Sequence, residues 1–176
     1  ISKHHKSRYR AMSKGIKISC IFLVFFLSFT PLSAHSQENK IEALEGQLQL
    51  EPENLETLKK LGTAYLKTRS DQDAIKILEK AKSIDSEDSE VRWKLALGYF
   101  YVKKRKLSIK EAKKSIGLNP NKFEPYVVLG DNLYLLKKNK NALEEYRTAL
   151  AINPQYLDAY KAIGNIHRNS KRYKEA

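Results

Sequence analysis

Apolar side chains recur at helical spacing along most of the chain, and the pattern restarts every 34 residues. A small residue marks one position of each copy, at Gly62, Ala96, Gly130 and Gly164. A second column closes each copy with proline or serine, at Pro52, Ser86, Pro120 and Pro154. Proline cannot continue a helix, because it lacks an N–H group and its ring clashes with the preceding turn. The period therefore predicts a repeated unit with an enforced helix stop.

Each copy contains two amphipathic stretches. In the first copy the spacing of Leu58, Leu61 and Tyr65 puts these residues on one helical face, and Ala74 and Leu78 begin a second such face. The pattern predicts helices over 54–68, 71–84, 89–102, 106–118, 123–136, 139–152 and 157–169. A helix of about 13 residues cannot bury its apolar stripe alone, so consecutive helices must stack. The expected fold class is all-α.

These columns resemble the tetratricopeptide repeat, a 34-residue unit with an aromatic or large residue, Leu-Gly, Tyr, Ala and a closing Pro at fixed offsets. The resemblance implies an α-solenoid of antiparallel helix pairs wound as a right-handed superhelix. Repeats are expected at 55–88, 89–122 and 123–156, with a lone leading helix in 37–54 and a truncated fourth repeat in 157–176. A solenoid normally ends in a helix with a polar outer face, so we expect the protein to continue past Ala176.

The second copy departs most from the repeat pattern. Arg92 stands in the aromatic column with Trp93 beside it, and Ser108, Ala112 and Ser115 fill the later columns. We expect looser packing in this copy. In the fourth copy His167 replaces the usual Tyr, which favours a structural role for this histidine over a catalytic one.

The N-terminal region is expected to be a targeting segment. Residues 1–11 precede the only methionine, Met12, and are assigned to an upstream, unstructured segment. Residues 12–36 have two lysines, an uncharged run over 18–29 and small residues around Pro31, the layout of a secretory signal cleaved after Ala34 or Ser36. The expected location is therefore periplasmic or extracellular. The alternative is a membrane anchor over 18–32, although the uncharged run is shorter than the roughly 20 residues of a membrane span.

The charge is mildly basic once this segment is set aside. The whole chain carries a formal net charge of +13, but residues 37–176 hold 27 basic and 20 acidic residues, a net charge of +7. The acids are interspersed, and the bases lack the interleaved stacking aromatics of single-strand binding, so nucleic acid is not an expected partner. The single cysteine, Cys20, excludes an intramolecular disulfide.

The sequence offers no catalytic constellation, metal site or cofactor motif, and we expect a protein that is not an enzyme and needs no cofactor. His4 and His5 have no companion ligands. An acidic column falls at the start of each first helix, where negative charge complements the helix dipole. Its members are Glu56, Glu90, Glu124 and Asp158.

The resemblance implies that the first helix of each pair lines a concave groove that binds a peptide. Carried onto this chain, the groove positions are Lys59, Thr63, Lys67, Trp93, Leu97, Phe100, Tyr101, Val127, Asp131, Tyr134, Lys161, Asn165 and Arg168. Trp93, Leu97 and Val127 are the expected anchors, since tryptophan and other large side chains dominate interface hot spots. Phe100 is equally consistent with packing between helices. A Lys and Asn clamp for acidic peptide tails could use Lys59, but Thr63, Leu97 and Asp131 stand where Asn or Lys is needed. That clamp is therefore expected to be absent.

Basic residues cluster where first helices end. This basic rim consists of Lys103, Lys104, Arg105, Lys106, Lys137 and Lys138. One interpretation is a solvated edge whose cations meet the negative helix end. The other is a stripe that contacts an anionic membrane, a polysaccharide or an acidic partner.

Two functions are consistent with these features. The leading hypothesis is an exported, non-catalytic scaffold that binds a protein segment in the groove. The alternative is the N-terminal regulatory or targeting region of a larger enzyme that continues past residue 176.

Overall fold

The computed structural model describes the backbone of residues 32–175 and the side chains of residues 36–170. The chain divides into two units, Ile1–Asn39 and Lys40–Ala176. The expected upstream segment 1–11, the anchor run and nearly all of the leader 12–36 lie outside the described residues, as do His4, His5 and Cys20. None of the helices in the described part combines the length and apolarity that a bilayer crossing requires.

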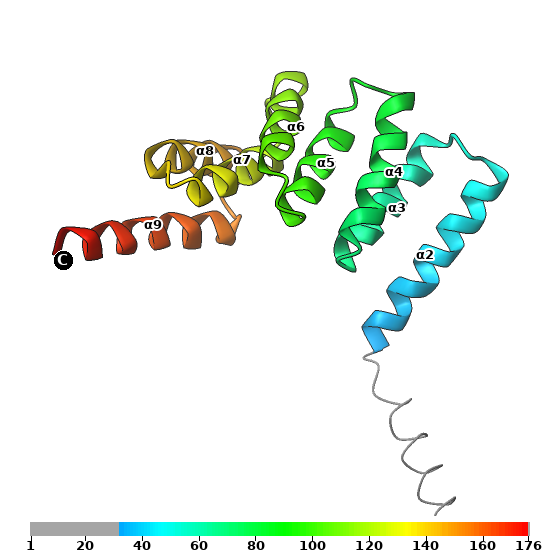
Figure 1. Cartoon of the computed structure of the whole chain (residues 1–176), viewed down its shortest axis with the longest axis horizontal. Helices are drawn as coiled ribbons and strands as arrows, with labels where there is room; N and C mark the ends of the chain where they lie inside the picture. Colours follow the sequence, from blue (N-terminus) through cyan, green and yellow to red (C-terminus); the bar gives the residue numbers. More distant parts are fainter. Residues whose placement is uncertain (1–31, 176) are drawn as a thin grey trace, which may run out of the picture. The chain divides into compact units, whose positions relative to one another are not determined.

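Eight helices and no strands make up the described part of the chain, which confirms an all-α helical repeat solenoid (Figure 1). The helices are α2 (Leu32–Leu50), α3 (Leu55–Lys67), α4 (Asp71–Ile84), α5 (Ser89–Tyr101), α6 (Arg105–Leu118), α7 (Glu124–Leu135), α8 (Asn139–Ile152) and α9 (Leu157–Glu175). Six of the seven helices expected from the repeat pattern begin and end within one residue of the predicted bounds. The seventh, α9, begins as predicted but continues six residues beyond the expected end at 169.

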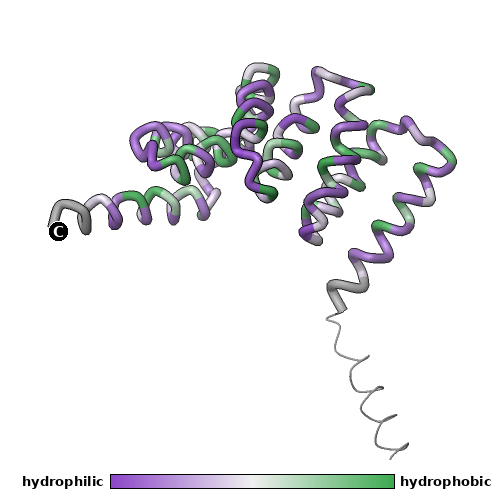
Figure 2. The backbone as a smooth tube through the Cα atoms, in the orientation of Figure 1, coloured by the Kyte–Doolittle hydropathy of each residue, from purple (hydrophilic) through white to green (hydrophobic). Residues whose placement is uncertain are grey.

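The apolar faces meet between neighbouring helices. Buried leucines of α3, α4 and α5 form one cluster, among them Leu58, Leu78 and Leu95, and Leu44 of α2 packs with Leu61 of α3. Further clusters join α5, α6 and α7, and then α8 and α9. Hydrophobic positions accordingly recur among hydrophilic ones along the helices (Figure 2).

Two glycines of the small-residue column permit close helix approach. A Cβ atom on Gly62 would lie 2.6 Å from Leu78 Cγ, and one on Gly130 would lie 2.8 Å from Tyr146 Cε1. The equivalent Gly164 of α9 would meet nothing within 4 Å, and His167 on the same helix is exposed. The column therefore acts as a contact point wherever a second helix covers it.

The turn between the helices of each pair has one repeated geometry. Arg69, Lys103 and Lys137 adopt left-handed backbone conformations with φ of 63°, 61° and 59°. The next amide in each turn donates back across the helix end, from Ser70 to Tyr65, Lys104 to Tyr99 and Lys138 to Leu133, each at 2.9 Å. This arrangement is the Schellman motif, which reverses the chain in few residues.

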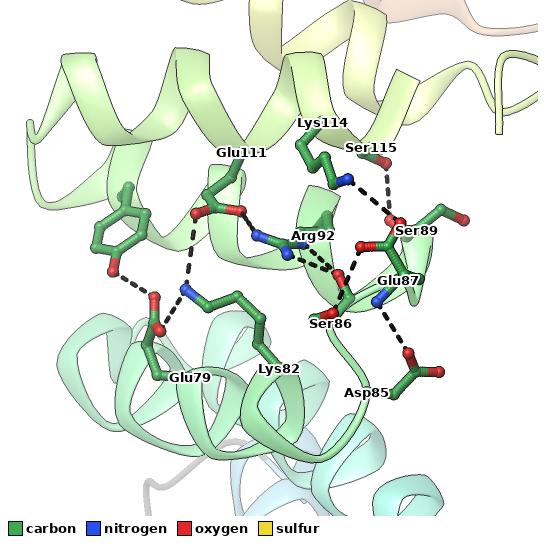
Figure 3. Close-up of polar contacts among 11 residues, drawn as sticks. Glu79, Lys82, Asp85, Ser86, Glu87, Ser89, Arg92, Glu111, Lys114 and Ser115 are labelled. Atoms are coloured by element: carbon green, nitrogen blue, oxygen red, sulfur yellow. Dashed lines mark hydrogen bonds and ion pairs between the residues drawn. The ribbon is translucent and has the colours of Figure 1, made fainter. Parts of the chain in front are cut away.

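The second repeat is closely packed through polar contacts, so the expected looser packing is not found (Figure 3). Arg92 Nη1 lies 2.7 Å from Glu111 Oε2, and Glu111 is only 4% exposed. Lys82 Nζ approaches the other carboxylate oxygen at 3.6 Å. Ser108 and Ser115 are fully buried and donate at 2.7 Å to the carbonyl oxygens of Ala96 and Ser89. At these positions hydrogen bonds and ion pairs thus replace apolar contacts.

Candidate functional site

The first helices of successive pairs form one side of the repeat array. Helix α3 contacts α5, and α5 contacts α7. At the end of the array the Asn169 side chain on α9 donates to the Tyr134 hydroxyl on α7 at 3.0 Å. We call the surface carried by these four helices the first-helix face. It holds the positions expected to line the groove.

The N-terminal end of this face is electrically neutralised. Lys59 Nζ lies 2.9 Å from Asp88 and 2.8 Å from Glu90, and Lys94 lies 2.6 Å from Glu90. Burial opposes the charged forms, but the hydrogen bonds and the charges of the partners together outweigh it, so the pKa of Lys59 is raised and that of Glu90 is lowered to about 2. Thr63 donates its hydroxyl to the carbonyl of Lys59 at 2.7 Å. Lys59 is therefore occupied within the protein.

The middle of the face carries Trp93 and Val127 at equivalent positions of α5 and α7. Both are half-buried, and neither belongs to the hydrophobic clusters of the described residues. Trp93 Nε1 has no acceptor within the described structure. These two side chains contribute apolar surface to the face without being core residues.

The neighbouring aromatic and aliphatic positions are more firmly held. Leu97 packs against the clusters on both sides of α5, and Phe100 packs against the second of them, so Phe100 serves helix packing. The guanidinium of Arg69 lies 3.5 Å from the ring centroid of Tyr101, close enough for a cation–π contact. Leu97 and Tyr101 are half-buried and form the support beside Trp93.

The C-terminal half of the face is acidic and rich in tyrosine. Asp131 accepts a hydrogen bond from the Tyr146 hydroxyl at 2.6 Å, and burial together with the charge of Asp158 raises the pKa of Asp131. Burial raises the pKa of Tyr156, and so do the charges of Asp158, Asp131 and Glu124 around it. We call Glu124, Asp131, Tyr156 and Asp158 the acidic cluster.

Three members of the acidic cluster, Glu124, Tyr156 and Asp158, were not among the site residues predicted from the sequence. Tyr156 lies in the turn before α9, outside the helical columns from which groove positions were assigned. Glu124 and Asp158 were interpreted only as partners of the helix dipole. The available signal was their spacing, since Glu124 and Asp158 begin successive first helices of the same face.

The remaining predicted positions are dispersed and solvent-facing. Lys161 is exposed and pairs with Asp158 at 2.8 Å, and Asn165 is exposed and accepts from Arg168. Lys67 is exposed as well. All members of the basic rim are exposed except Arg105, which is half-buried.

An open pocket lies at the N-terminal end of the array, away from the predicted groove positions. This pocket of about 320 Å³ lies between α2, α3 and α4, where Leu48, Tyr65 and Ile77 are among its lining residues. Within the described residues no three His, Cys, Asp or Glu side chains gather as a metal site would require.

Two stretches of the sequence match family models, residues 56–88 as a tetratricopeptide repeat and residues 130–170 as a TPR repeat. Searching curated proteins gave no match. Among solved structures, a crystal structure of MamA shares 25% identity, with 81% of this chain and 86% of that chain covered and a TM-score of 0.69. The MamA 41-end structure from Desulfovibrio magneticus RS-1 shares 17% identity, covers 82% of this chain and 81% of that chain, and has a TM-score of 0.69.

A third similar solved structure is the first TPR of Spaghetti (RPAP3) bound to the HSP90 peptide SRMEEVD. It shares 22% identity, with 66% of this chain and 93% of that chain covered and a TM-score of 0.62. This likeness concerns the fold. The repeated columns, the stacked helix pairs and the two family matches together identify the chain as a tetratricopeptide repeat protein.

Proposed function

We propose that the protein is a non-catalytic interaction scaffold whose first-helix face holds a peptide segment of a partner protein. The observation that carries this proposal is the pair Trp93 and Val127, which lie outside the hydrophobic core clusters on adjacent first helices. Half-exposed apolar anchors surrounded by polar groups are typical of interface hot spots.

The partner segment should combine an apolar side chain with basic residues. At one end of the face Lys59 is already paired with two carboxylates, so it offers little positive charge. At the other end the acidic cluster places three carboxylates around Tyr156. Asp158 is paired with the exposed Lys161, whereas Glu124 and Asp131 have no ion pair within the described structure. Such a face attracts cations and repels acidic tails. The solved neighbour's SRMEEVD peptide supports peptide binding as a class but differs in charge from the segment proposed here.

Selection from a random peptide library tests this proposal. The full chain is the bait, and the Trp93→Ala variant removes peptides that bind elsewhere. Tyr160→Ala is the matched control, because Tyr160 is an exposed aromatic residue of α9 outside the groove positions. We expect enriched peptides with an apolar residue near Arg or Lys.

Those peptides should lose about 2 kcal/mol of binding free energy on Trp93→Ala and almost none on Tyr160→Ala. Thermal unfolding of both variants provides the check on folding. Enrichment of acidic peptides, or equal binding to folded Trp93→Ala, would remove the basis of the proposal.

The location of the protein is a separate proposal. The leader-like layout of residues 12–36 supports export with removal of that segment. Amino-terminal sequencing of the mature protein tests it: a start at His35 or Gln37 is expected, and a product that retains Met12 would count against cleavage.

A further inference from the structure

The edge formed by the α5–α6 and α7–α8 turns combines the basic rim with exposed leucines. Leu107, Leu135 and Leu136 are 40%, 49% and 44% exposed, respectively. They adjoin the rim lysines in sequence, in the segments KKRKL (103–107) and LLKK (135–138). Basic and apolar side chains therefore share each turn.

A buried hydrogen bond brings the two turns to the same edge. Asn132 Nδ2 near the end of α7 donates at 2.7 Å to Ser108 Oγ near the start of α6. Leu107 precedes Ser108, and Leu135 lies one helical turn beyond Asn132. This contact places the two turns that carry the exposed leucines at one edge of the array.

The rim cations are not explained by contacts within the protein. None of the rim residues has an ion pair within the described part of the chain. Lys104 and Lys138 precede α6 and α8, whose first turns contain no acid. Positive charge at a helix N-terminus opposes the helix dipole.

The corresponding turn of the first repeat provides the contrast. Helix α4 has Asp71 and Asp73 in its first turn, and Arg69 pairs with Asp71 at 3.2 Å. The two acids complement the dipole of α4, and the Arg69–Asp71 pair leaves this turn with little net charge. Unbalanced positive charge is therefore a feature of the second and third turns.

We propose that this edge docks the protein on an anionic lipid bilayer. The lysines would lie among anionic headgroups, and the three leucines would enter the boundary between headgroups and acyl chains. Lysine stems can follow the leucines while the ammonium groups stay in the polar layer. The leucines favour a bilayer over an anionic polysaccharide, because a polysaccharide offers no hydrocarbon to receive them.

An environment-sensitive dye placed on the rim tests the docking in the full chain. The chain carries Cys20→Ser and a single dye-labelled cysteine from Leu107→Cys. The matched position is Gly117→Cys, which is exposed near the other end of α6, about 15 Å away at 1.5 Å per residue. Vesicles of phosphatidylcholine with phosphatidylglycerol should shift the emission at 107 to shorter wavelength and leave 117 unchanged. If the protein bound vesicles through its N-terminal region alone, the emission of the dyes at 107 and 117 would respond in the same way.

Charge variants of the dye-labelled chain give the second arm. Replacing Lys103, Lys104, Lys137 and Lys138 by Gln should lower vesicle affinity at least tenfold, since each basic residue at such a surface contributes about fivefold. The control replaces Lys76, Lys80, Lys110 and Lys113, which are exposed on α4 and α6 and carry the same total charge. It should retain most of the affinity, and salt should weaken wild-type binding.

Three results would overturn the proposal. The first is a dye at 117 that responds to vesicles as strongly as the dye at 107. The second is a control variant that loses as much vesicle affinity as the rim variant. The third is a dye at 107 whose emission shifts with dextran sulfate but not with vesicles. The last result would assign the edge to an anionic polysaccharide.

Discussion

At the residue scale, Arg92 shows how a departure from the repeat pattern is accommodated. It occupies the column of Leu58 in the first repeat, and its partner Glu111 occupies the column of Ile77. The resemblance identified the substitution in the aromatic column. It did not identify the partner, because residues 92 and 111 lie on different helices and their pairing depends on how those helices meet.

A double-mutant cycle tests this ion pair. Arg92→Leu alone should destabilise the protein by about 3 kcal/mol, because it removes the closest partner of the buried Glu111 carboxylate. Arg92→Leu with Glu111→Ile restores the apolar pair of the first repeat and should lie within about 1 kcal/mol of the wild type. Urea unfolding measures both. Equal destabilisation by the single and double variants would show that the site does not tolerate apolar packing.

Glu90 gives a pH-dependent prediction at the same scale. Its pKa in the folded protein is lowered to about 2 from an ordinary value of 4.5. The pair with Lys59 and Lys94 is therefore fully stabilising above pH 4.5, and that contribution is lost as the pH falls towards 2. Because a third of the side chain is in water, we expect about 1 kcal/mol.

The measurement is urea unfolding of wild type and Glu90→Gln between neutral and acidic pH. The stability difference between the two proteins should shrink on acidification. Glu56→Gln provides the control, because Glu56 has the equivalent position on α3 and is 63% exposed. A Glu90→Gln difference that is constant with pH would contradict the ion-pair account.

At the element scale, helix bounds followed from local chemistry. Prolines and the small-residue columns predicted the ends of α3 to α8 closely. The extension of α9 and the start of α2 at Leu32 were not predicted, because the repeat columns assign ends only where a neighbouring helix packs back. The left-handed turn residues were not predicted either, since Arg69, Lys103 and Lys137 carry side chains where glycine is the usual occupant.

Lys137→Gly tests the turn geometry. Lys137 has a φ of 59°, which an L side chain adopts only at a cost, so glycine should stabilise the protein by about 0.5 kcal/mol. Lys138→Gly removes the same charge at a φ of −85° and should be neutral or destabilising. The measurement is the difference in Tm between the Lys137→Gly and Lys138→Gly variants. An equal change in both would argue against strain at residue 137.

At the scale of the whole molecule, the charge is divided between two surfaces. The acidic cluster lies on the first-helix face, and the cationic rim lies at the edge of the α5–α6 and α7–α8 turns. The sequence predicted the rim as a run of lysines. It did not predict the acidic cluster or the neutralised Lys59, because both arise from side chains of successive repeats that meet only after stacking.

The central claim is that a peptide covers Trp93 on the first-helix face. Trp93 is the only tryptophan, so its emission reports on this one site. Titrating the full chain with a library-selected basic peptide should shift the Trp93 emission to shorter wavelength. The Kd from this shift should agree with the Kd measured for the same peptide by direct binding. Saturating peptide that leaves the Trp93 emission unchanged would contradict the account.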